Sequence, residues 1–231
     1  MSFRGARPGR FARRLLVAGG LLACLAPASA QSGAVPGYLP NPPGTYALQD
    51  IMQAGDGRVL DSQGRTRRLA EFTRGRVTLL SFIYSSCADP AGCPYAYTVF
   101  HLVRSALEED PAARRKVRLV SLSFDPHRDT PETLRLYGGP DANREAPVRW
   151  DYLTTRSTAE LLPILSAYGQ DASVEKDAAG RPRGPFAHVL KVFLIDRRGR
   201  VREIYTTAYL LPPVVVNDIR TLLLEEGREG H

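Results

Sequence analysis

The stretch of sequence that decides the fold spans residues 76–109 and reads "RVTLLSFIYSSCADPAGCPYAYTVFHLVRSALEE". It begins with a near-continuous apolar, β-branched and aromatic run of strand length, which predicts a strand buried on both faces. Pro94 suits the first turn of a helix, because its fixed φ fits there and its missing N–H donor is not needed. The residues after Pro94 continue at helical period. The stretch therefore predicts a buried strand joined to a helix by a loop that carries Cys87 and Cys93.

The segments that follow repeat this alternation of strand and helix. Residues 117–124 form a second apolar run, which predicts another strand. In the next segment, "DPHRDTPETLRLYG", either Asp129 or Thr130 can cap a helix. Pro131 can open that helix and Gly138 can end it. The order strand, helix, strand, helix predicts a parallel sheet with right-handed crossovers.

The next part of the chain adds a third strand and helix and then a polar excursion. Residues 148–153 are a short strand candidate, and Ser157 has capping-box spacing to Glu160 before the helical segment "LLPILSAYG". Pro163 lies inside that segment and predicts either a kink or a late helix start. Residues 171–184 are polar and rich in glycine and proline, which predicts a functional loop.

The C-terminal part predicts a β-hairpin and a last helix. Residues 186–195 and 201–205 are predicted strands on either side of "DRRGR", whose glycine supplies the turn. Residues 217–226 form a predicted terminal helix. The order β-α-β-α followed by β-β-α predicts an α/β protein of thioredoxin-like fold. It would have a central mixed sheet flanked by helices, an N-terminal extension and an insertion before the last hairpin.

The start of the chain has the composition of a secretory signal peptide. It holds five arginines and no acid, continues with an apolar run over residues 15–25 and finishes with "ASA" at residues 28–30. The apolar run is about half of the roughly 20 residues that a membrane span needs. We therefore expect residues 1–30 to be cleaved and the protein to be exported to the periplasm. The alternative is a lipoprotein cleavage box, which would leave Cys24 lipidated and the protein tethered to a membrane.

Removal of this segment nearly cancels the net charge. The full sequence carries 31 basic and 24 acidic residues, so the loss of five arginines leaves 26 against 24, a net charge of +2. Such a domain gives no support to nucleic-acid binding, which needs a clustered basic face. Residues 31–45 hold four prolines and three glycines and predict an extended linker. The thioredoxin-like domain is expected over residues 46–231.

Cys87 and Cys93 are compatible with three chemistries. Export places them in an oxidising compartment, where a disulfide can persist as a static staple. The partial positive charge of a helix N-terminus favours the thiolate at Cys93, which suits a reversible redox pair. Two thiolates and one imidazole suit three-coordinate Cu(I), and a fourth ligand would suit Zn²⁺. Spacing alone does not choose among the staple, the redox pair and the metal site.

A metal site needs a third ligand, and histidine is the residue type to consider. His101 falls about two turns into the helix that follows Cys93 and is expected to pack rather than bind. His127 lies in a polar loop and is expected to be solvated. His188 opens the strand that leads into the hairpin, and in a thioredoxin-like fold that connection borders the cysteine loop. We therefore take His188 as the candidate third ligand.

Three segments of this sequence resemble the Sco/SenC family, the thioredoxin-like copper proteins of the periplasm and mitochondria that help to assemble cytochrome c oxidase. "VSLSFDPHRDTPETLRLYG", at residues 120–138, is similar to the family's "SVDPERDTPExLxxY". "LLSFIYSSC" with the "CP" after the loop, and "HVLKVFLIDRRGRV", match two further parts of the pattern. The resemblance implies that Cys87, Cys93 and His188 bind copper as Cu(I), with Cu(II) left open.

The chain departs from the family pattern at two points. Five residues separate Cys87 from Cys93, where the family usually has three. Ala187 stands before His188, where the family commonly has an aspartate. The longer loop can change the copper affinity, the redox potential or the preferred activity.

The resemblance implies an exported metallochaperone that delivers Cu(I) to the copper-binding subunit of cytochrome c oxidase or to another copper acceptor. Copper binding requires reduced cysteines, so a thiol reductant is a second expected partner. Reduction of the acceptor's own cysteines would be a thiol–disulfide oxidoreductase activity. Two alternatives stay open: a reductase that delivers no copper, and a binding module stapled by a disulfide. Membrane association would come from the partner or from an uncleaved or lipidated N-terminus, and no nucleic-acid partner is expected.

Overall fold

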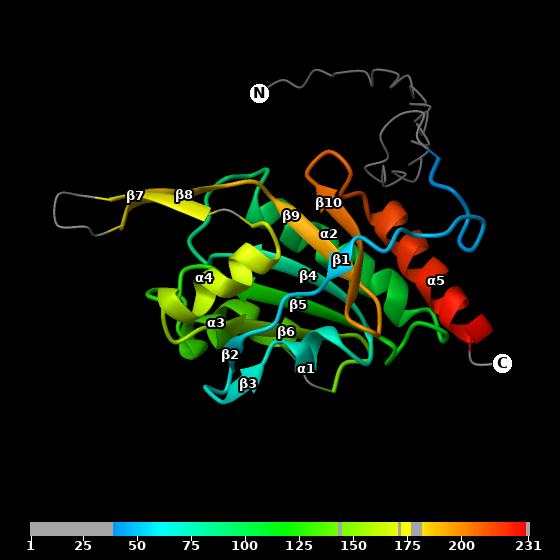
Figure 1. Ribbon diagram of the computed structural model, residues 1–231, viewed down its shortest axis with the longest axis horizontal. Helices are drawn as coiled ribbons and strands as arrows, with labels where there is room; N and C mark the ends of the chain where they lie inside the picture. Colours follow the sequence, from blue (N-terminus) through cyan, green and yellow to red (C-terminus); the bar gives the residue numbers. More distant parts are fainter. Residues whose placement is uncertain (1–38, 143–144, 171, 177–181, 230–231) are drawn as a thin grey trace, which may run out of the picture. The chain divides into compact units, whose positions relative to one another are not determined.

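The computed structural model describes residues 39–142, 145–170, 172–176 and 182–229 (Figure 1). The strands are β1 (Met52–Gln53), β2 (Arg58–Asp61), β3 (Thr66–Arg68), β4 (Val77–Ile83), β5 (Val117–Ser123), β6 (Arg149–Thr154), β7 (Ala172–Lys176), β8 (Pro182–His188), β9 (Lys191–Ile195) and β10 (Arg200–Thr206). The helices are α1 (Ala70–Thr73), α2 (Cys93–Glu108), α3 (Pro131–Gly138), α4 (Thr158–Ala167) and α5 (Pro212–Glu229), with a short 3₁₀ helix, η1 (Gly139–Ala142), after α3.

In the described part of the chain, eight strands form one mixed sheet. Its order is β1-β10-β9-β4-β5-β6-β2-β3. β4, β5 and β6 are parallel neighbours, and the other pairs in this sheet are antiparallel. Because α2 connects β4 to β5 and α3 connects β5 to β6, the predicted βαβ units are confirmed. The order from β4 to α5 is that of a thioredoxin-like α/β fold, with β1, β2, β3 and α1 added before it.

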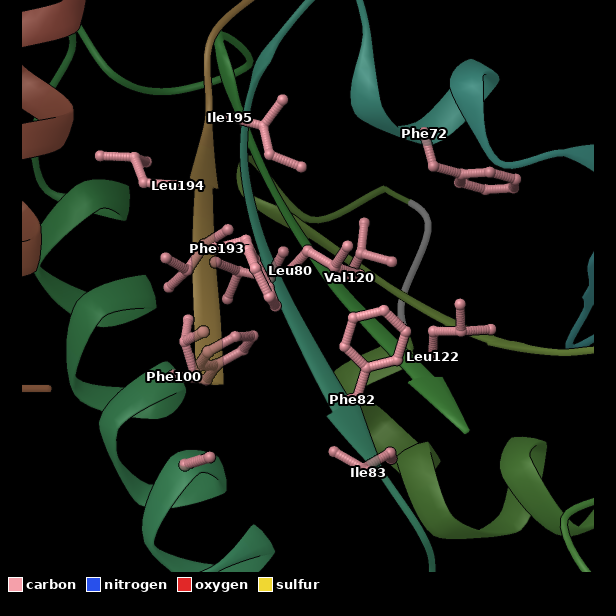
Figure 2. Packing of buried hydrophobic residues seen from close by; sticks show 14 of the residues in the cluster. Phe72, Leu80, Phe82, Ile83, Phe100, Val120, Leu122, Phe193, Leu194 and Ile195 are labelled. Carbon is pink, nitrogen blue, oxygen red and sulfur yellow. The ribbon is translucent and has the colours of Figure 1, made fainter. Parts of the chain in front are cut away.

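β4 lies in the middle of the core. All seven of its residues are buried, because both faces of the sheet are covered. On one face Phe82 packs edge-on against Tyr168, which follows α4, with ring centroids 5.4 Å apart. On the other face Ile83 lines a small cavity together with Phe100 of α2 and Tyr137 of α3. Figure 2 shows how the apolar side chains of β4, β5 and β9 fill the space between α1 and α2.

The boundaries of α3 and α4 follow the capping signals in the sequence. Thr130 caps α3 through its side chain, and the helix begins and ends at the predicted residues. Ser157 caps α4, its hydroxyl accepting a hydrogen bond at 3.3 Å from the N–H three residues further on. α4 begins directly after Ser157 and contains Pro163, so the late start is wrong. Local capping chemistry therefore decides where these helices begin.

Two predictions about the region before the last hairpin are wrong. Most of residues 171–184 was expected to form a loop, but β7 and β8 form a separate two-stranded sheet there. The single strand expected over residues 186–195 is broken, because β8 pairs with β7 whereas β9 pairs with β4 and β10. Proline and glycine suggested a loop in this segment, yet edge strands tolerate proline, and both strands of a two-stranded sheet are edge strands.

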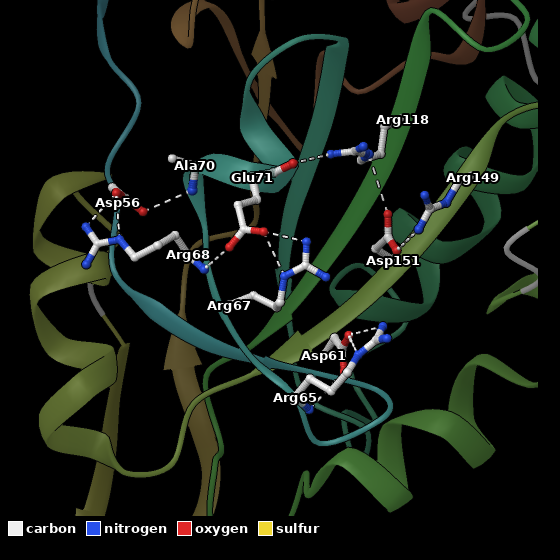
Figure 3. A network of polar contacts seen from close by, with 10 residues as sticks. All are labelled: Asp56, Asp61, Arg65, Arg67, Arg68, Ala70, Glu71, Arg118, Arg149 and Asp151. Atoms are coloured by element: carbon white, nitrogen blue, oxygen red, sulfur yellow. Dashed lines mark hydrogen bonds and ion pairs between the residues drawn. The ribbon is translucent and has the colours of Figure 1, made fainter.

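A hairpin of β2 and β3 and the short helix α1, which the sequence did not predict, precede the central strand. The buried Asp61 carboxylate closes the hairpin turn by accepting hydrogen bonds from the backbone N–H of Arg65 at 3.0 Å and from its guanidinium at 2.7 and 2.9 Å. The Arg118 guanidinium donates to the carbonyl of Glu71 at 2.8 Å, which ties α1 to β5. Figure 3 shows the charged side chains that join this hairpin, α1 and the neighbouring strands β5 and β6.

The described chain before β1 is docked on α5. The N–H of Gly44 donates to the hydroxyl of Thr221 at 3.0 Å, and the side-chain amide of Asn217 donates to the carbonyl of Asn41 at 2.9 Å. The last residues of the expected linker thus lie against the domain. The predicted signal peptide lies outside the described residues. Within the part that the structure describes, no helix is both long and apolar enough to cross a membrane.

Candidate functional site

Cys87 and Cys93 lie after the carboxyl end of β4, where the chain turns into α2. The backbone N–H of Cys87 donates to the carbonyl of Tyr84 at 3.2 Å, and the residue is half-buried. Cys93 is the first residue of α2 and is only 1% exposed. Both are free cysteines, and Cys87 lies near enough to Cys93 to raise the pKa of that thiol. The structure places the cysteine loop between the buried strand β4 and the helix α2, and the role of the pair stays a prediction.

The five residues between the cysteines form a compact turn built on Asp89. Its carboxylate accepts a hydrogen bond from the N–H of Ala91 at 3.0 Å, and its carbonyl accepts one from the N–H of Gly92 at 3.0 Å. A Cβ atom at Gly92 would lie only 3.3 Å from those two groups of Asp89, so glycine suits the position. The longer spacing is therefore taken up by a turn that brings the chain back on itself.

The Cys93 thiolate is not favoured, contrary to the expectation from its helix N-terminus. Burial raises the pKa of Cys93 above its ordinary value. Hydrogen bonding from the backbone at Tyr84 and at Cys93 itself lowers that pKa, whereas the adjacent Cys87 side chain raises it further. Desolvation outweighs the favourable backbone interactions, so the buried cysteine of the metal-free protein is a neutral thiol near neutral pH.

Two of the histidines considered from the sequence lie outside the cysteine site. His101 packs against the rings of Tyr97 and Trp150, with centroids 4.5 and 5.2 Å away, which confirms its predicted packing role. His127 is exposed, as predicted, and its Nε2 lies 3.2 Å from the hydroxyl of Thr158. Neither is a member of a described group of potential metal ligands.

His188 is the last residue of β8, where its backbone is paired with Ala172. Its side chain lies outside the described part of the chain, so its role as the third ligand stays a prediction. Among the described residues, no group of three or more His, Cys, Asp or Glu side chains is arranged to hold a metal ion. The described donor set of the candidate site is therefore the Cys87 and Cys93 thiols, and soft sulfur donors of this kind suit Cu(I).

Asp129 is a residue of the site region that the sequence suggested only as a helix cap. Thr130 provides that cap, and Asp129 is instead buried, with 1% exposure, against Ser85 and Ser123. Ser85 and Asp129 are 44 positions apart, so their pairing depends on the parallel alignment of β4 and β5. The available signal in the sequence was the presence of two adjacent cap candidates where the helix needs one.

Tyr137 of α3 lies close enough to the cysteine loop to be influenced by its charged groups. Burial raises its pKa to about 12, and the negative charge of Asp129 acts in the same direction. Its ring packs edge-on against Tyr97 of α2, with centroids 6.1 Å apart. The Tyr137 and Tyr97 rings therefore join α3 to α2 through an aromatic contact.

Solved structures with the same fold include three Sco proteins. ScoI of Bradyrhizobium japonicum, solved with copper bound, is 24% identical over 74% of this chain and 99% of its own, with a TM-score of 0.58. Yeast Sco1, also solved with copper bound, is 17% identical over 78% of this chain and 96% of its own, with a TM-score of 0.59. BsSco, a member of the Sco family of cytochrome c oxidase assembly proteins in which a disulfide switch was identified, is 20% identical over 80% and 98%, with a TM-score of 0.55.

The family assignment rests on the sequence itself. A comparison with curated proteins found no match. The SCO1/SenC family, in contrast, matches residues 52–224, from the first strand of the sheet almost to the end of the last helix. That range includes the cysteine loop, Asp129 and His188. The chain belongs to the SCO1/SenC family.

Proposed function

We propose that this protein binds copper as Cu(I) through Cys87, Cys93 and His188 and delivers it during the assembly of cytochrome c oxidase. The observation that carries the proposal is the placement of two neighbouring free cysteines after a buried strand, in a chain of the SCO1/SenC family. Further support comes from the relatives, since two were solved with copper bound and one is described as an oxidase assembly protein.

The donor set suits this cargo. Two thiolates are soft ligands that select Cu(I), and one imidazole completes a three-coordinate site. Both cysteines must be reduced before loading, and coordination releases their thiol protons. Because Cys87 is half-buried and Cys93 is 1% exposed, copper and its acceptor approach from the side of Cys87.

Delivery follows from the same difference in exposure. A ligand of the acceptor can replace the accessible Cys87 first, while Cys93 still holds the ion. Replacement of the remaining ligands then completes the transfer without free copper. The acceptor is the copper-binding subunit of cytochrome c oxidase or another protein with a vacant copper site.

Reduction of the acceptor's cysteines is a second candidate function, which the presence of two neighbouring free cysteines favours. The Cys87 thiolate would attack an acceptor disulfide, forming a mixed disulfide and releasing one acceptor thiolate. Cys93 would then pass its thiol proton to the released acceptor thiolate and attack Cys87 in that mixed disulfide, which releases the second acceptor thiolate and leaves a Cys87–Cys93 disulfide. Two electrons pass to the acceptor, and a thiol reductant restores the pair.

We further propose that the protein works in the periplasm after cleavage of residues 1–30. The arginine-rich start, the apolar run and the "ASA" before Gln31 support this location. N-terminal sequencing of the protein recovered from the producing cell tests it. A chain that begins at Gln31 supports cleavage and export, whereas a lipid-modified Cys24 at the N-terminus supports the membrane-tethered alternative.

Anaerobic titration of the reduced protein with Cu(I), in competition with a chelator, tests the role of His188. We expect His188→Ala to weaken binding by more than the roughly 10-fold that loss of an outer-shell partner costs. His127→Ala is the matched control, because His127 is exposed and contacts Thr158 instead of the cysteines. Its affinity should equal that of the wild type.

Each other outcome has a definite meaning. Equal affinity in wild type and His188→Ala would remove His188 from the ligand set. Absence of tight Cu(I) binding in the wild type would overturn copper delivery. If that same protein reduced an oxidised acceptor peptide, the reductase function would stand in its place.

A further inference from the structure

We propose that Asp129 is a positioning residue that fixes the backbone at Ser85, just after the end of β4. Through this segment it also fixes the position of Cys87. The inference deepens the proposed function, on which its copper readout rests. Asp129 touches neither the copper nor the acceptor in this account. It holds the chain segment from which the accessible cysteine projects.

The Asp129 carboxylate gathers donors from the ends of two neighbouring strands. Its Oδ2 accepts a hydrogen bond from the backbone N–H of Ser85 at 3.0 Å, and its Oδ1 accepts one from the hydroxyl of the same serine. The hydroxyl of Ser123 also donates to Oδ2, at 2.5 Å. Hydrogen bonds to a buried carboxylate are charge-assisted and stronger than neutral ones. Both oxygens of Asp129 are thus engaged at the ends of β4 and β5.

The hydrogen bonds of Asp129 to Ser85 and Ser123, here called the clamp, are supported by further hydrogen bonds in the loop that carries Asp129. The backbone N–H of Asp129 donates to the carbonyl of Asp125 at 2.8 Å, and the N–H of Asp125 donates to the hydroxyl of Ser123 at 3.0 Å. Ser123 is opposite Ile83 in the parallel register, and the N–H of Phe124 donates to the Ile83 carbonyl at 2.9 Å. The loop that carries Asp129 is therefore fixed to the same sheet end as the segment that it holds.

The connection from this clamp to the cysteine is short. A single residue separates Ser85 from Cys87, and the Cys87 N–H closes a turn on the carbonyl of Tyr84 at 3.2 Å. A shift of Ser85 consequently moves Cys87. Cys93 is placed differently, because it belongs to α2 and is 1% exposed. Loss of the clamp is expected to change the geometry of the pair mainly at Cys87.

The contacts also separate this role from that of a helix cap. Thr130 caps α3 by accepting from the N–H of Thr133 at 3.2 Å, so the helix start does not need the side chain of Asp129. That carboxylate points back to Ser85 and Ser123 instead. The buried Asp129 carboxylate therefore binds the chain just after β4, next to Cys87 and Cys93, instead of capping α3.

The test compares Asp129→Asn with Asp196→Asn. Asp196 is a matched buried carboxylate, since its Oδ1 accepts from the N–H groups of Arg198 and Arg200 at 2.9 Å in the β9–β10 turn. That turn follows Ile195, which pairs with Thr78 near the start of β4 and thus lies at the opposite end from Cys87. Both variants should lose stability, but only Asp129→Asn should lose Cu(I) affinity, by at least about 10-fold.

A second readout needs no copper. In the reduced, metal-free protein, the rate at which iodoacetamide alkylates Cys87 should rise in Asp129→Asn and stay unchanged in Asp196→Asn. Ser85→Ala keeps the Asp129 charge and the Ser85 N–H but removes one hydroxyl contact. Its alkylation rate should fall between wild type and Asp129→Asn, and this variant also serves if Asp129→Asn does not fold.

These measurements distinguish positioning of Cys87 by Asp129 from a general loss of stability and from an effect of the Asp129 charge alone. Unchanged alkylation in both Asp129→Asn and Ser85→Ala overturns the proposal, and so do equal changes in Asp129→Asn and Asp196→Asn. An effect of Asp129→Asn with none in Ser85→Ala also overturns it, because charge rather than position would then be responsible. If the wild type binds no Cu(I), the proposed function fails, while the alkylation rates still decide the role of Asp129.

Discussion

Cys87 and Cys93 have the same chemistry in the sequence but different surroundings in the fold. Cys93 is 1% exposed and has a raised pKa, whereas Cys87 is half-buried. The sequence identified both residues and the helix that begins at Cys93. It could not show how deeply that helix start is buried, and burial reverses the expected direction of the pKa shift. The pair therefore has one cysteine that is partly exposed to solvent and one that is buried.

At the same scale, Asp61 makes stability depend on pH. Burial raises the pKa of Asp61, but hydrogen bonds from the Arg65 side chain and from the N–H groups of Arg65 and Gln63 lower it more, so the net pKa lies below 3.8. A carboxyl group with a lowered pKa stabilises the fold above its ordinary pKa. That stabilisation is lost as the pH falls through the pKa of the folded state.

We predict that Asp61→Asn lowers the free energy of unfolding by about 1–3 kcal/mol near neutral pH, since hydrogen bonds to a buried charge are weakened. The difference between variant and wild type should shrink as the pH falls well below 3.8, where the wild type also loses the charge. Urea unfolding of both proteins across this range measures it. A difference that stays constant with pH would show that the charge of Asp61 is not responsible.

At the scale of elements, β4 is the strand on which both the core and the site depend. Leu80 is fully buried in its middle, opposite Val120 of β5 and Phe193 of β9. Leu80→Ala should lower the free energy of unfolding by about 2–5 kcal/mol, because it removes buried contacts and leaves a cavity. Leu136 of α3 is 71% exposed, so Leu136→Ala should change the free energy of unfolding by no more than about 0.5 kcal/mol. Equal losses in the two variants would contradict the central position of β4.

The elements also show where local sequence signals suffice. A continuous apolar run predicted β4, and a threonine followed by a proline predicted the start of α3, since both signals act within a few residues. The strands β7 and β8 were missed because glycine and proline in that segment predicted a loop. Their pairing, and the break before β9, depend on which strands become neighbours in space. A pattern within one segment does not contain that information.

At the scale of the whole molecule, the thioredoxin-like arrangement was predictable from the order of elements, but several long-range contacts were not. Tyr46 donates to one oxygen of Asp218, and Tyr205 donates to the other at 2.7 Å, which joins the chain before β1 to α5 and β10. The contact of Asp129 with Ser85 is of the same kind. Each joins residues far apart in the sequence, so it follows from the assembled fold. The two cysteines, in contrast, were identified because strand, turn and helix are consecutive.

The central claim is that the reduced pair holds one Cu(I), and an anaerobic chelator-competition titration of wild type and Cys87→Ser tests it most directly. Cys87 is half-buried, so its replacement by serine removes a soft ligand with little disturbance of the core. We predict one tightly bound Cu(I) per wild-type chain and no tight binding in Cys87→Ser. Wild type that fails to retain Cu(I), or a variant that retains it equally well, would contradict the account.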